Sequence, residues 1–366
     1  MSSLQNKLLV AGAVVVAGAL FFVVRSSSPG AGSGNGVANG AASTAGPSDS
    51  AAPAGPRPLL VSSTKGDPAH LHLFSFTPPS ELSPLAKGTN TEYDGVYSPD
   101  GRRIAFAALT NEPGSPPAGQ IFTMARDGSD RKAITQAEPG RVASSPKWSP
   151  DGKSIAYSSV KFQDGQQPNI TVQLMQADGS GARQVVEGVL PDWSPDGKSI
   201  AFTAFDFNQT FAPSLRVVDV AGGASKELTH GENAMMPAYS PDGATIAFVS
   251  DGGAGALPDI YLMNADGSNK RRLTKTDADF ETGPAWSADG QTVYFARLSN
   301  EEVPHATLQS MPVAGGEPKR LSEEGMTTIP GNGAGFLMVM LTGQGRTLFE
   351  LPKDAPPGGA APSATR

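Results

Sequence analysis

A unit of about 46 residues recurs five times in the middle of this chain, and it constrains the fold more than any other feature. Each unit contains an aromatic residue followed by Ser-Pro-Asp-Gly or, once, Ser-Ala-Asp-Gly. The aromatic positions are Tyr97, Trp148, Trp193, Tyr239 and Trp286, spaced 51, 45, 46 and 47 residues apart. A fixed period of this length indicates a protein assembled from copies of one supersecondary unit.

The residues of one unit predict four short strands. Ser-Pro-Asp-Gly is a tight turn, because Pro presets φ and Gly supplies a left-handed exit. The strand after the first turn alternates Ile104 and Phe106 with Ala105, so one face is bulky and the other small. About 30 residues after the aromatic position, Asp-Gly-Ser or Ala-Gly-Gly predicts a second hairpin turn. Four strands per unit, repeated around an axis, predict an all-β propeller of four-stranded blades.

Composition agrees with this fold class and excludes several functions. The chain has 366 residues, of which 43 are Gly and 32 Pro, too many for a helical bundle. It carries 28 basic and 35 acidic residues, and the net charge of −7 with no long basic run argues against nucleic-acid binding. There is no Cys, which excludes disulfides, thiolate metal sites and a cysteine nucleophile.

The repeated motif resembles a known family. The unit W-S-P-D-G-x-x-I-A-F, with its trailing N-A-D-G-S-x-x-R-R-L-T, is similar to the WD40-like repeat of TolB-type propellers, over about residues 57–354. TolB itself has an α/β domain before its propeller, and a tether stands in that place here. The resemblance implies a non-enzymatic envelope scaffold that binds a protein or envelope component. Similar repeats occur in some serine peptidases, but the G-x-S-x-G elbow of their hydrolase domain is absent from this sequence.

Outside the propeller, three segments differ in composition. Residues 1–25 contain the apolar run Leu8–Val24, followed directly by Arg25. This run predicts either an uncleaved inner-membrane anchor or a cleaved signal peptide, the latter giving a secreted form. Residues 26–56 predict a disordered Gly/Ser/Ala/Pro linker, and residues 355–366 a disordered tail. Either interpretation of the N-terminus places the propeller, residues 57–354, in the periplasm or another extracytoplasmic space, with membrane contact through the N-terminal helix only.

The blade count depends on the two ends of the propeller. Residues 59–90 predict three strands of an opening blade, and residues 326–352 predict three strands of a closing blade. Three strands, then twenty, then three favour seven blades. Six remain possible if the terminal pieces merge into one blade.

The sequence predicts no catalytic residue, no metal site and no cofactor. The five turn aspartates recur around the ring instead of converging, which indicates turn chemistry. His70 and His72 share a strand face, but no third ligand accompanies them.

The predicted binding site follows from topology. In a four-stranded meander the two kinds of repeated turn lie on one face, and the irregular loops lie on the other. We call these the turn face and the loop face. Because recognition usually lies on variable loops, we predict binding at the loop face, just before each blade's first strand. The candidate residues are Tyr93, Asp94, Arg141, Asp192, Asn233, Met235, Phe280 and Glu281. The alternative is an enzyme or small-ligand binder of hydrolase or lyase type that uses the central channel.

Overall fold

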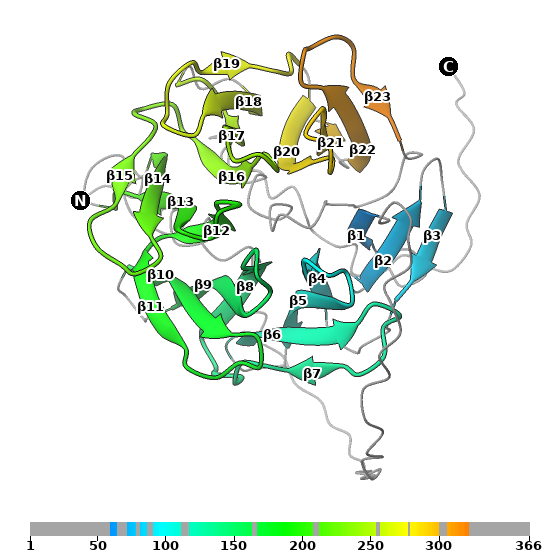
Figure 1. Cartoon of the computed structure of the whole chain (residues 1–366), viewed down its shortest axis with the longest axis vertical. Helices are drawn as coiled ribbons and strands as arrows, with labels where there is room; N and C mark the ends of the chain where they lie inside the picture. The colour runs from blue at the N-terminus through cyan, green and yellow to red at the C-terminus, as the bar shows by residue number, and fades with distance from the viewer. Residues whose placement is uncertain are drawn as a thin grey trace, which may run out of the picture.

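A computed structural model shows five β-sheets arranged around a common centre (Figure 1). One of them has eight strands and comprises two blades, so the described strands form six blades. The structure describes residues 59–63, 72–77, 81–85, 91–110, 116, 118–162, 167–207, 212–253, 257–276, 279–299 and 306–321. The predicted anchor, linker, closing strands 326–352 and tail all lie outside these residues. The described residues form strands and turns without a helix, and hence include no helix that could cross a membrane.

The first blade has three strands and the next five blades have four strands each. The opening blade contains β1 (Leu59–Ser63), β2 (His72–Thr77) and β3 (Glu81–Pro84). The second contains β4 (Thr91–Tyr97), β5 (Arg103–Thr110), β6 (Ala118–Ala125) and β7 (Lys132–Ala133). The third contains β8 (Arg141–Trp148), β9 (Ser154–Lys161), β10 (Asn169–Gln176) and β11 (Arg183–Glu187).

The last three described blades repeat this pattern. The fourth contains β12 (Val189–Trp193), β13 (Ser199–Phe205), β14 (Pro213–Asp219) and β15 (Lys226–Glu227). The fifth contains β16 (Met235–Tyr239), β17 (Thr245–Ser250), β18 (Asp259–Asn264) and β19 (Arg271–Arg272). The sixth contains β20 (Asp279–Trp286), β21 (Thr292–Ser299), β22 (Ala306–Pro312) and β23 (Lys319–Arg320).

Each blade is an antiparallel meander that runs outward from the centre. Within every blade each strand pairs with the next in sequence. The first strands, including β4, β8, β12 and β16, lie nearest the centre, and the short fourth strands lie at the rim (Figure 1). The second and third blades are also joined by one parallel bridge between Gly119 and Val142. A Cβ at Gly119 would lie 2.8 Å from Val142 Cγ1, so only glycine permits this approach.

The core forms between the blades, as the alternating pattern predicts. The second strands place Phe106, Phe202, Phe248 and Phe295 at 0 to 1% exposure. The small residues of the other face, such as Ala105 and Ala201, are equally buried. Both faces of each sheet therefore pack against neighbours, bulky side chains filling the space over alanines.

The Ser-Pro-Asp-Gly turns are built as the sequence predicts. In the fourth blade Ser194 Oγ donates to Asp196 Oδ1 at 2.6 Å, and the same aspartate accepts from Lys198 N at 3.0 Å. Gly197 exits the turn with φ of +71°, and the five turn glycines all have φ between +67° and +72°. These hydrogen bonds hold the pKa of Asp196 below its usual value, the serine hydroxyl having the largest effect. The turn aspartates are therefore structural.

Candidate functional site

All five inner strands that precede an Asp-Gly turn have a bulge at the same position. The register shifts between Tyr93 and Val96 in β4, and at the corresponding place in β8, β12, β16 and β20. The first bulge residue has a left-handed φ in each case. These residues are Asp94 (58°), Ser145 (52°), Leu190 (55°), Met236 (59°) and Gly283 (64°). The bulge turns the following side chains and brings polar groups of neighbouring blades together.

The predicted site residues lie in these inner strands, which corrects their expected position in loops. Seven of the eight belong to β4, β8, β12, β16 or β20, and only Asn233 precedes its strand. The reason is that each first strand begins several residues earlier than the aromatic position suggests.

Five of the eight predicted site residues are buried. Tyr93, Asp94, Met235, Phe280 and Glu281 are all 7% exposed or less. Met235 and Phe280 belong to one hydrophobic cluster, and Tyr93 to another. Burial raises the pKa of the Tyr93 phenol above its usual value. These five side chains take part in blade packing, so replacing them would disturb stability as well as any binding.

Asp94 and Asp192 contact the inner strand β8 from the two neighbouring blades. Asp94 Oδ2 accepts hydrogen bonds from Ser145 N at 3.0 Å and Ser145 Oγ at 3.1 Å. Lys147 Nζ lies 3.4 Å from Asp192 Oδ1, and Asp192 Oδ2 accepts from Tyr239 N at 2.8 Å. The result is a polar chain across the inner strands of four consecutive blades.

The electrostatics of this polar chain follow from its burial. Burial raises the pKa of Asp94 to about 6, although the Ser145 hydrogen bonds and the Lys147 charge act in the opposite direction. Burial likewise raises the pKa of Asp192, again opposed by Lys147. Burial and the nearby Asp192 charge raise the pKa of Tyr239 to about 12. This polar chain therefore contains carboxyl groups that take up protons more readily than exposed carboxyl groups do.

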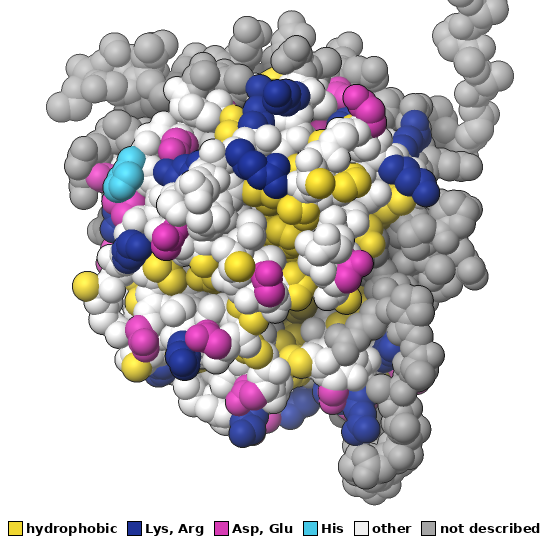
Figure 2. Space-filling model, turned by 45° about the horizontal axis from the view of Figure 1, so that its top comes forward, with side chains coloured by type: hydrophobic (Ala, Val, Ile, Leu, Met, Phe, Trp, Pro, Cys, Tyr) yellow, Lys and Arg dark blue, Asp and Glu magenta, His cyan; other side chains and the backbone are white. Residues whose placement is uncertain are grey.

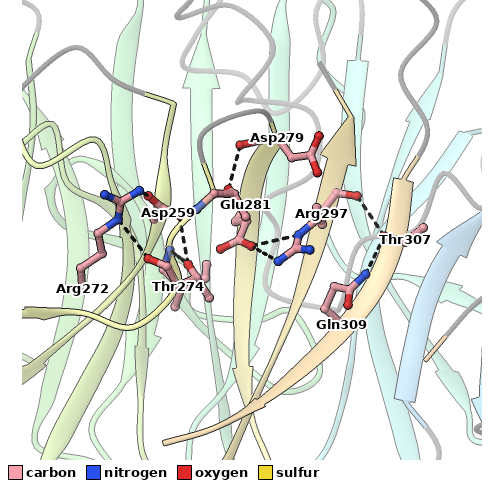
Figure 3. A network of polar contacts seen from close by, with 10 residues as sticks. Asp259, Arg272, Thr274, Asp279, Glu281, Arg297, Thr307 and Gln309 are labelled. Carbon is pink, nitrogen blue, oxygen red and sulfur yellow. Dashed lines mark hydrogen bonds and ion pairs between the residues drawn. The ribbon is translucent and has the colours of Figure 1, made fainter. Parts of the chain in front are cut away.

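Glu281 lies in a second polar network between the fifth and sixth blades (Figure 3). Glu281 Oε1 accepts from Arg297 Nη2 at 2.8 Å and from Nε at 3.1 Å. Across the blade boundary, Asp259 pairs with Arg272 and accepts from Thr276 N at 3.1 Å. Burial raises the pKa of both carboxyl groups, each opposed by its arginine. Both acids thus form buried ion pairs.

Arg141 and Asn233 lie at the loop face and remain half-buried. Arg141 Nε donates to Glu138 Oε2 at 2.6 Å, and Lys161 Nζ lies 3.0 Å from the other oxygen of Glu138. Asn233 Nδ2 donates to Asp251 Oδ2 at 2.8 Å. Neither residue joins the inner-strand polar chain, so the structure does not gather all eight predicted residues into one site.

The loop face also exposes apolar side chains that the predicted set omits. Phe162, Phe205, Phe207 and Leu257 are half-buried and pack on the cluster that contains Met235 and Phe280. Phe205 ends the second strand of its blade, and the other three lie between the second and third strands of three consecutive blades. We call these four residues the loop-face apolar patch. The abundance of Phe in these loops is the sequence signal that could have identified the patch. The opposite face of the ring, the turn face, is the one that Figure 2 shows, and there hydrophobic side chains gather in a central hollow among acidic and basic groups.

Within the part of the chain that the structure describes, no three His, Cys, Asp or Glu side chains are grouped as metal ligands would be. The chemistry at hand is therefore that of buried ion pairs, partly exposed aromatic rings and backbone groups.

Two curated proteins are similar to part of this chain. The chain is 30% identical over 187 residues to the "Uncharacterized peptidase YuxL" of Bacillus subtilis, which is 49% of this chain and 25% of that protein. It is 35% identical over 89 residues to "Dipeptidyl-peptidase 5" of Porphyromonas endodontalis, 24% of this chain and 12% of the relative. The chain thus spans a quarter or less of these curated relatives.

Solved structures and a family model identify the fold more closely. Putative TolB from Agrobacterium tumefaciens matches with a TM-score of 0.55 and 21% identity, covering 76% of this chain and 92% of that one. TolB from Acinetobacter baumannii matches with a TM-score of 0.55 and 21% identity, covering 73% and 67%. The TolB beta propeller domain model matches residues 160–351, more than half of the sequence. This chain therefore belongs to the TolB beta propeller domain family.

Proposed function

We propose that this protein is a non-enzymatic scaffold of the cell envelope, which binds a protein or envelope component through its loop face. The observation that carries the proposal is the loop-face apolar patch. Its side chains are partly exposed although the blades beneath them are fully packed. Partly exposed aromatic residues on a rigid scaffold are typical of protein-binding surfaces.

The geometry of the patch supports a defined binding surface. The rings of Phe205 and Phe207 stack with centroids 5.9 Å apart and planes 18° apart. Gln167 Nε2, from the third blade, donates to the Phe207 carbonyl at 3.4 Å. The loops of two neighbouring blades therefore support each other, which lowers the entropic cost of ordering them on binding.

The location in this proposal rests on the sequence. The apolar run Leu8–Val24 would hold the propeller at the inner membrane, and residues 26–56 would separate it from the bilayer surface. Cleavage after this run would give a secreted form with the same binding face.

The alternative function is an enzyme or small-ligand binder that uses the central channel. The observation in its favour is the polar chain of the inner strands, where Asp94 and Asp192 flank Lys147 and have raised pKa values. Both named relatives are peptidases, but the matched region is a minor part of each. The same inner-strand groups already bond to neighbouring blades, which favours a structural role for them.

The experiment compares two double variants of the full-length chain. Phe205→Ser with Phe207→Ser alters the patch, and Lys153→Ser with Lys198→Ser alters exposed positions on the turn face. Partners are captured from envelope extracts after crosslinking and quantified by mass spectrometry. Two contact aromatics contribute roughly 1 to 2 kcal/mol each, so the first variant should capture its partner at least ten-fold less.

The control variant should retain capture, and circular dichroism should show both variants folded. Loss of capture by the Lys153 and Lys198 variant, with the patch variant unaffected, would place binding on the turn face. Turnover of a small substrate that Lys147→Met abolishes in a folded protein would favour the enzymatic alternative instead.

A further inference from the structure

A shallow cavity of about 330 Å³ lies on the turn face, on the opposite side of the ring from the loop-face apolar patch. Three aromatic rings from three consecutive blades line it, those of Trp193, Tyr239 and Trp286. Asp192 and the turn prolines Pro195 and Pro241 complete most of its wall. We call this the aromatic cavity.

The tryptophan rings of the aromatic cavity are held in fixed orientations. Trp193 Nε1 donates to the Lys147 carbonyl at 3.1 Å, and Trp286 Nε1 donates to the Ala238 carbonyl at 2.9 Å. Their polar atoms are therefore used within the blades, which leaves π faces and ring edges for the cavity. Tyr239 and Trp286 remain half-buried. Aromatic faces carry a negative quadrupole and attract cations, arginine guanidinium in particular.

The charges around the aromatic cavity are asymmetric. In the second, third and fourth blades, the turn motif is followed by a basic residue, Arg102, Lys153 or Lys198. Lys153 Nζ lies 3.9 Å from the turn carboxylate Asp151, and Lys198 Nζ lies 3.8 Å from Asp196. In the fifth and sixth blades, the corresponding residues are the exposed Ala244 and Gln291.

The turn carboxylates of those two blades are therefore negative without an adjacent lysine. Serine hydroxyls lower the pKa of Asp242 and of Asp289, so both are ionised at neutral pH. The fifth and sixth blades form two of the three sides of the aromatic cavity. The negative potential of the turn face thus concentrates beside the exposed aromatic rings.

We propose that the aromatic cavity binds an arginine side chain of an extended segment of a partner protein. The guanidinium lies against the rings of Trp286 and Tyr239, and Asp242 and Asp289 attract its charge. The flanking backbone of the segment runs over the turn prolines. This site lies on the turn face, so it is independent of the loop-face function proposed above.

The repeat itself distinguishes this site from ordinary blade packing. An aromatic residue occupies the same position of the repeat in all five blades, so the presence of the aromatic residue reflects blade structure. The fifth and sixth blades differ from the other three at the residue after the turn glycine, which is neutral in these two blades and basic in the others. Blade stability does not require that difference, because the turn hydrogen bonds are the same in every blade.

The first test uses tryptophan fluorescence of the full-length chain. Two of its three tryptophans line the aromatic cavity, so a bound ligand should change the emission. The probes are acetyl-Gly-Arg-Gly-amide and the same peptide with citrulline, which has the shape of arginine without its charge. We expect a saturable change with the arginine peptide and at least five-fold weaker binding of the citrulline peptide. Equal binding of the two peptides, or no saturable change, would overturn the proposal.

The second test changes the charge without touching the aromatic rings. Ala244→Lys with Gln291→Lys restores the pattern of the other blades and should weaken arginine-peptide binding about five-fold. The matched control, Ala221→Lys with Ala314→Lys, adds the same charge at exposed positions on the outer turns of that face. The control should bind as the unmodified chain does. Unchanged binding in the first variant, or equal loss in both, would contradict the assigned position.

Discussion

At the scale of single residues, the inner-strand bulge is the feature that organises the centre of the ring. Its left-handed φ is unfavourable for Leu190 and Met236, which costs roughly 1 to 2 kcal/mol per residue. Their side chains are 6% and 2% exposed, so burial offsets this strain. At Asp94 the same backbone conformation aims a carboxylate at the Ser145 amide of the next blade. One backbone feature therefore serves packing in some blades and polar contact in another.

Asp94 gives a prediction about pH. Its pKa is raised to about 6 by burial, so the folded protein binds this proton more tightly than the unfolded chain does. Lowering the pH from about 7 to about 4 should therefore stabilise the fold through this group. Asp94→Asn removes the titratable group. Asparagine still offers a side-chain oxygen as an acceptor, and it tolerates a left-handed φ. Relative to this variant, the unmodified chain should gain on the order of 1 to 3 kcal/mol over that interval.

The measurement is urea unfolding of both proteins at several pH values. The difference between them isolates Asp94 from the other buried acids, Asp192, Asp259 and Glu281, whose pKa values are also raised. Parallel stability curves for the two proteins would show that Asp94 does not titrate in this range.

At the scale of elements, side chains from one blade bond to the backbone of the next. The indole groups of Trp193 and Trp286 donate to carbonyls of the preceding inner strand. At the rim, basic residues of the fourth strands donate to turn carbonyls of the following blade. These contacts are Arg183 to Val220 (2.7 Å), Lys226 to Asp266 (3.1 Å) and Arg271 to Val313 (2.6 Å). The blades are therefore connected at both edges, which fixes their relative rotation.

The tryptophans at the repeated aromatic position should lose unequal amounts of stability on the same substitution. Trp286 Nε1 has an acceptor, whereas the buried Nε1 of Trp148 has none among the described residues. Phenylalanine removes the indole N–H in both cases. Trp286→Phe should lose about 1 kcal/mol more stability than Trp148→Phe, because only the first loses a hydrogen bond. Chemical denaturation of the two variants measures this difference, and equal losses would argue against a stabilising role for the bond.

At the scale of the whole molecule, stability depends on each blade covering its neighbour. The described residues contain five four-stranded blades, two of them joined in one eight-stranded sheet, and one three-stranded blade. The family model extends to residue 351, which agrees with a propeller that continues beyond the last described strand, β23. Seven blades therefore stay a prediction, with six as the alternative.

Truncation tests whether residues 326–352 complete the ring. If they do, ending the chain after Ser322 should uncover a blade face and lower the melting temperature by about 10 °C or more. Ending it after Lys353 removes only the predicted tail and should change the melting temperature little. A chain ending at Ser322 that melts within about 2 °C of the full-length protein would place residues 326–352 outside the propeller.

The sequence by itself determined the blade. The turn chemistry of Ser-Pro-Asp-Gly and the alternation of Ile104, Ala105 and Phe106 are local, because each depends on neighbours within a few residues. The period of the repeat then led to a propeller, and the same residues carried the resemblance to the TolB-type family. Hydrogen bonds, left-handed glycines and buried phenylalanines agree with that prediction.

Only the tertiary structure decided the environment of the candidate site residues. Glu281 and Asp192 look like mouth residues in sequence, but one is buried against Arg297 and the other bonds to Lys147 and Tyr239. The partners of Asp192 lie about one repeat away in sequence, and Asp94 meets Ser145 across 51 positions. No local pattern specifies such pairs, because they depend on the angle at which two blades pack. The exposed aromatic surfaces on both faces arise from the same packing.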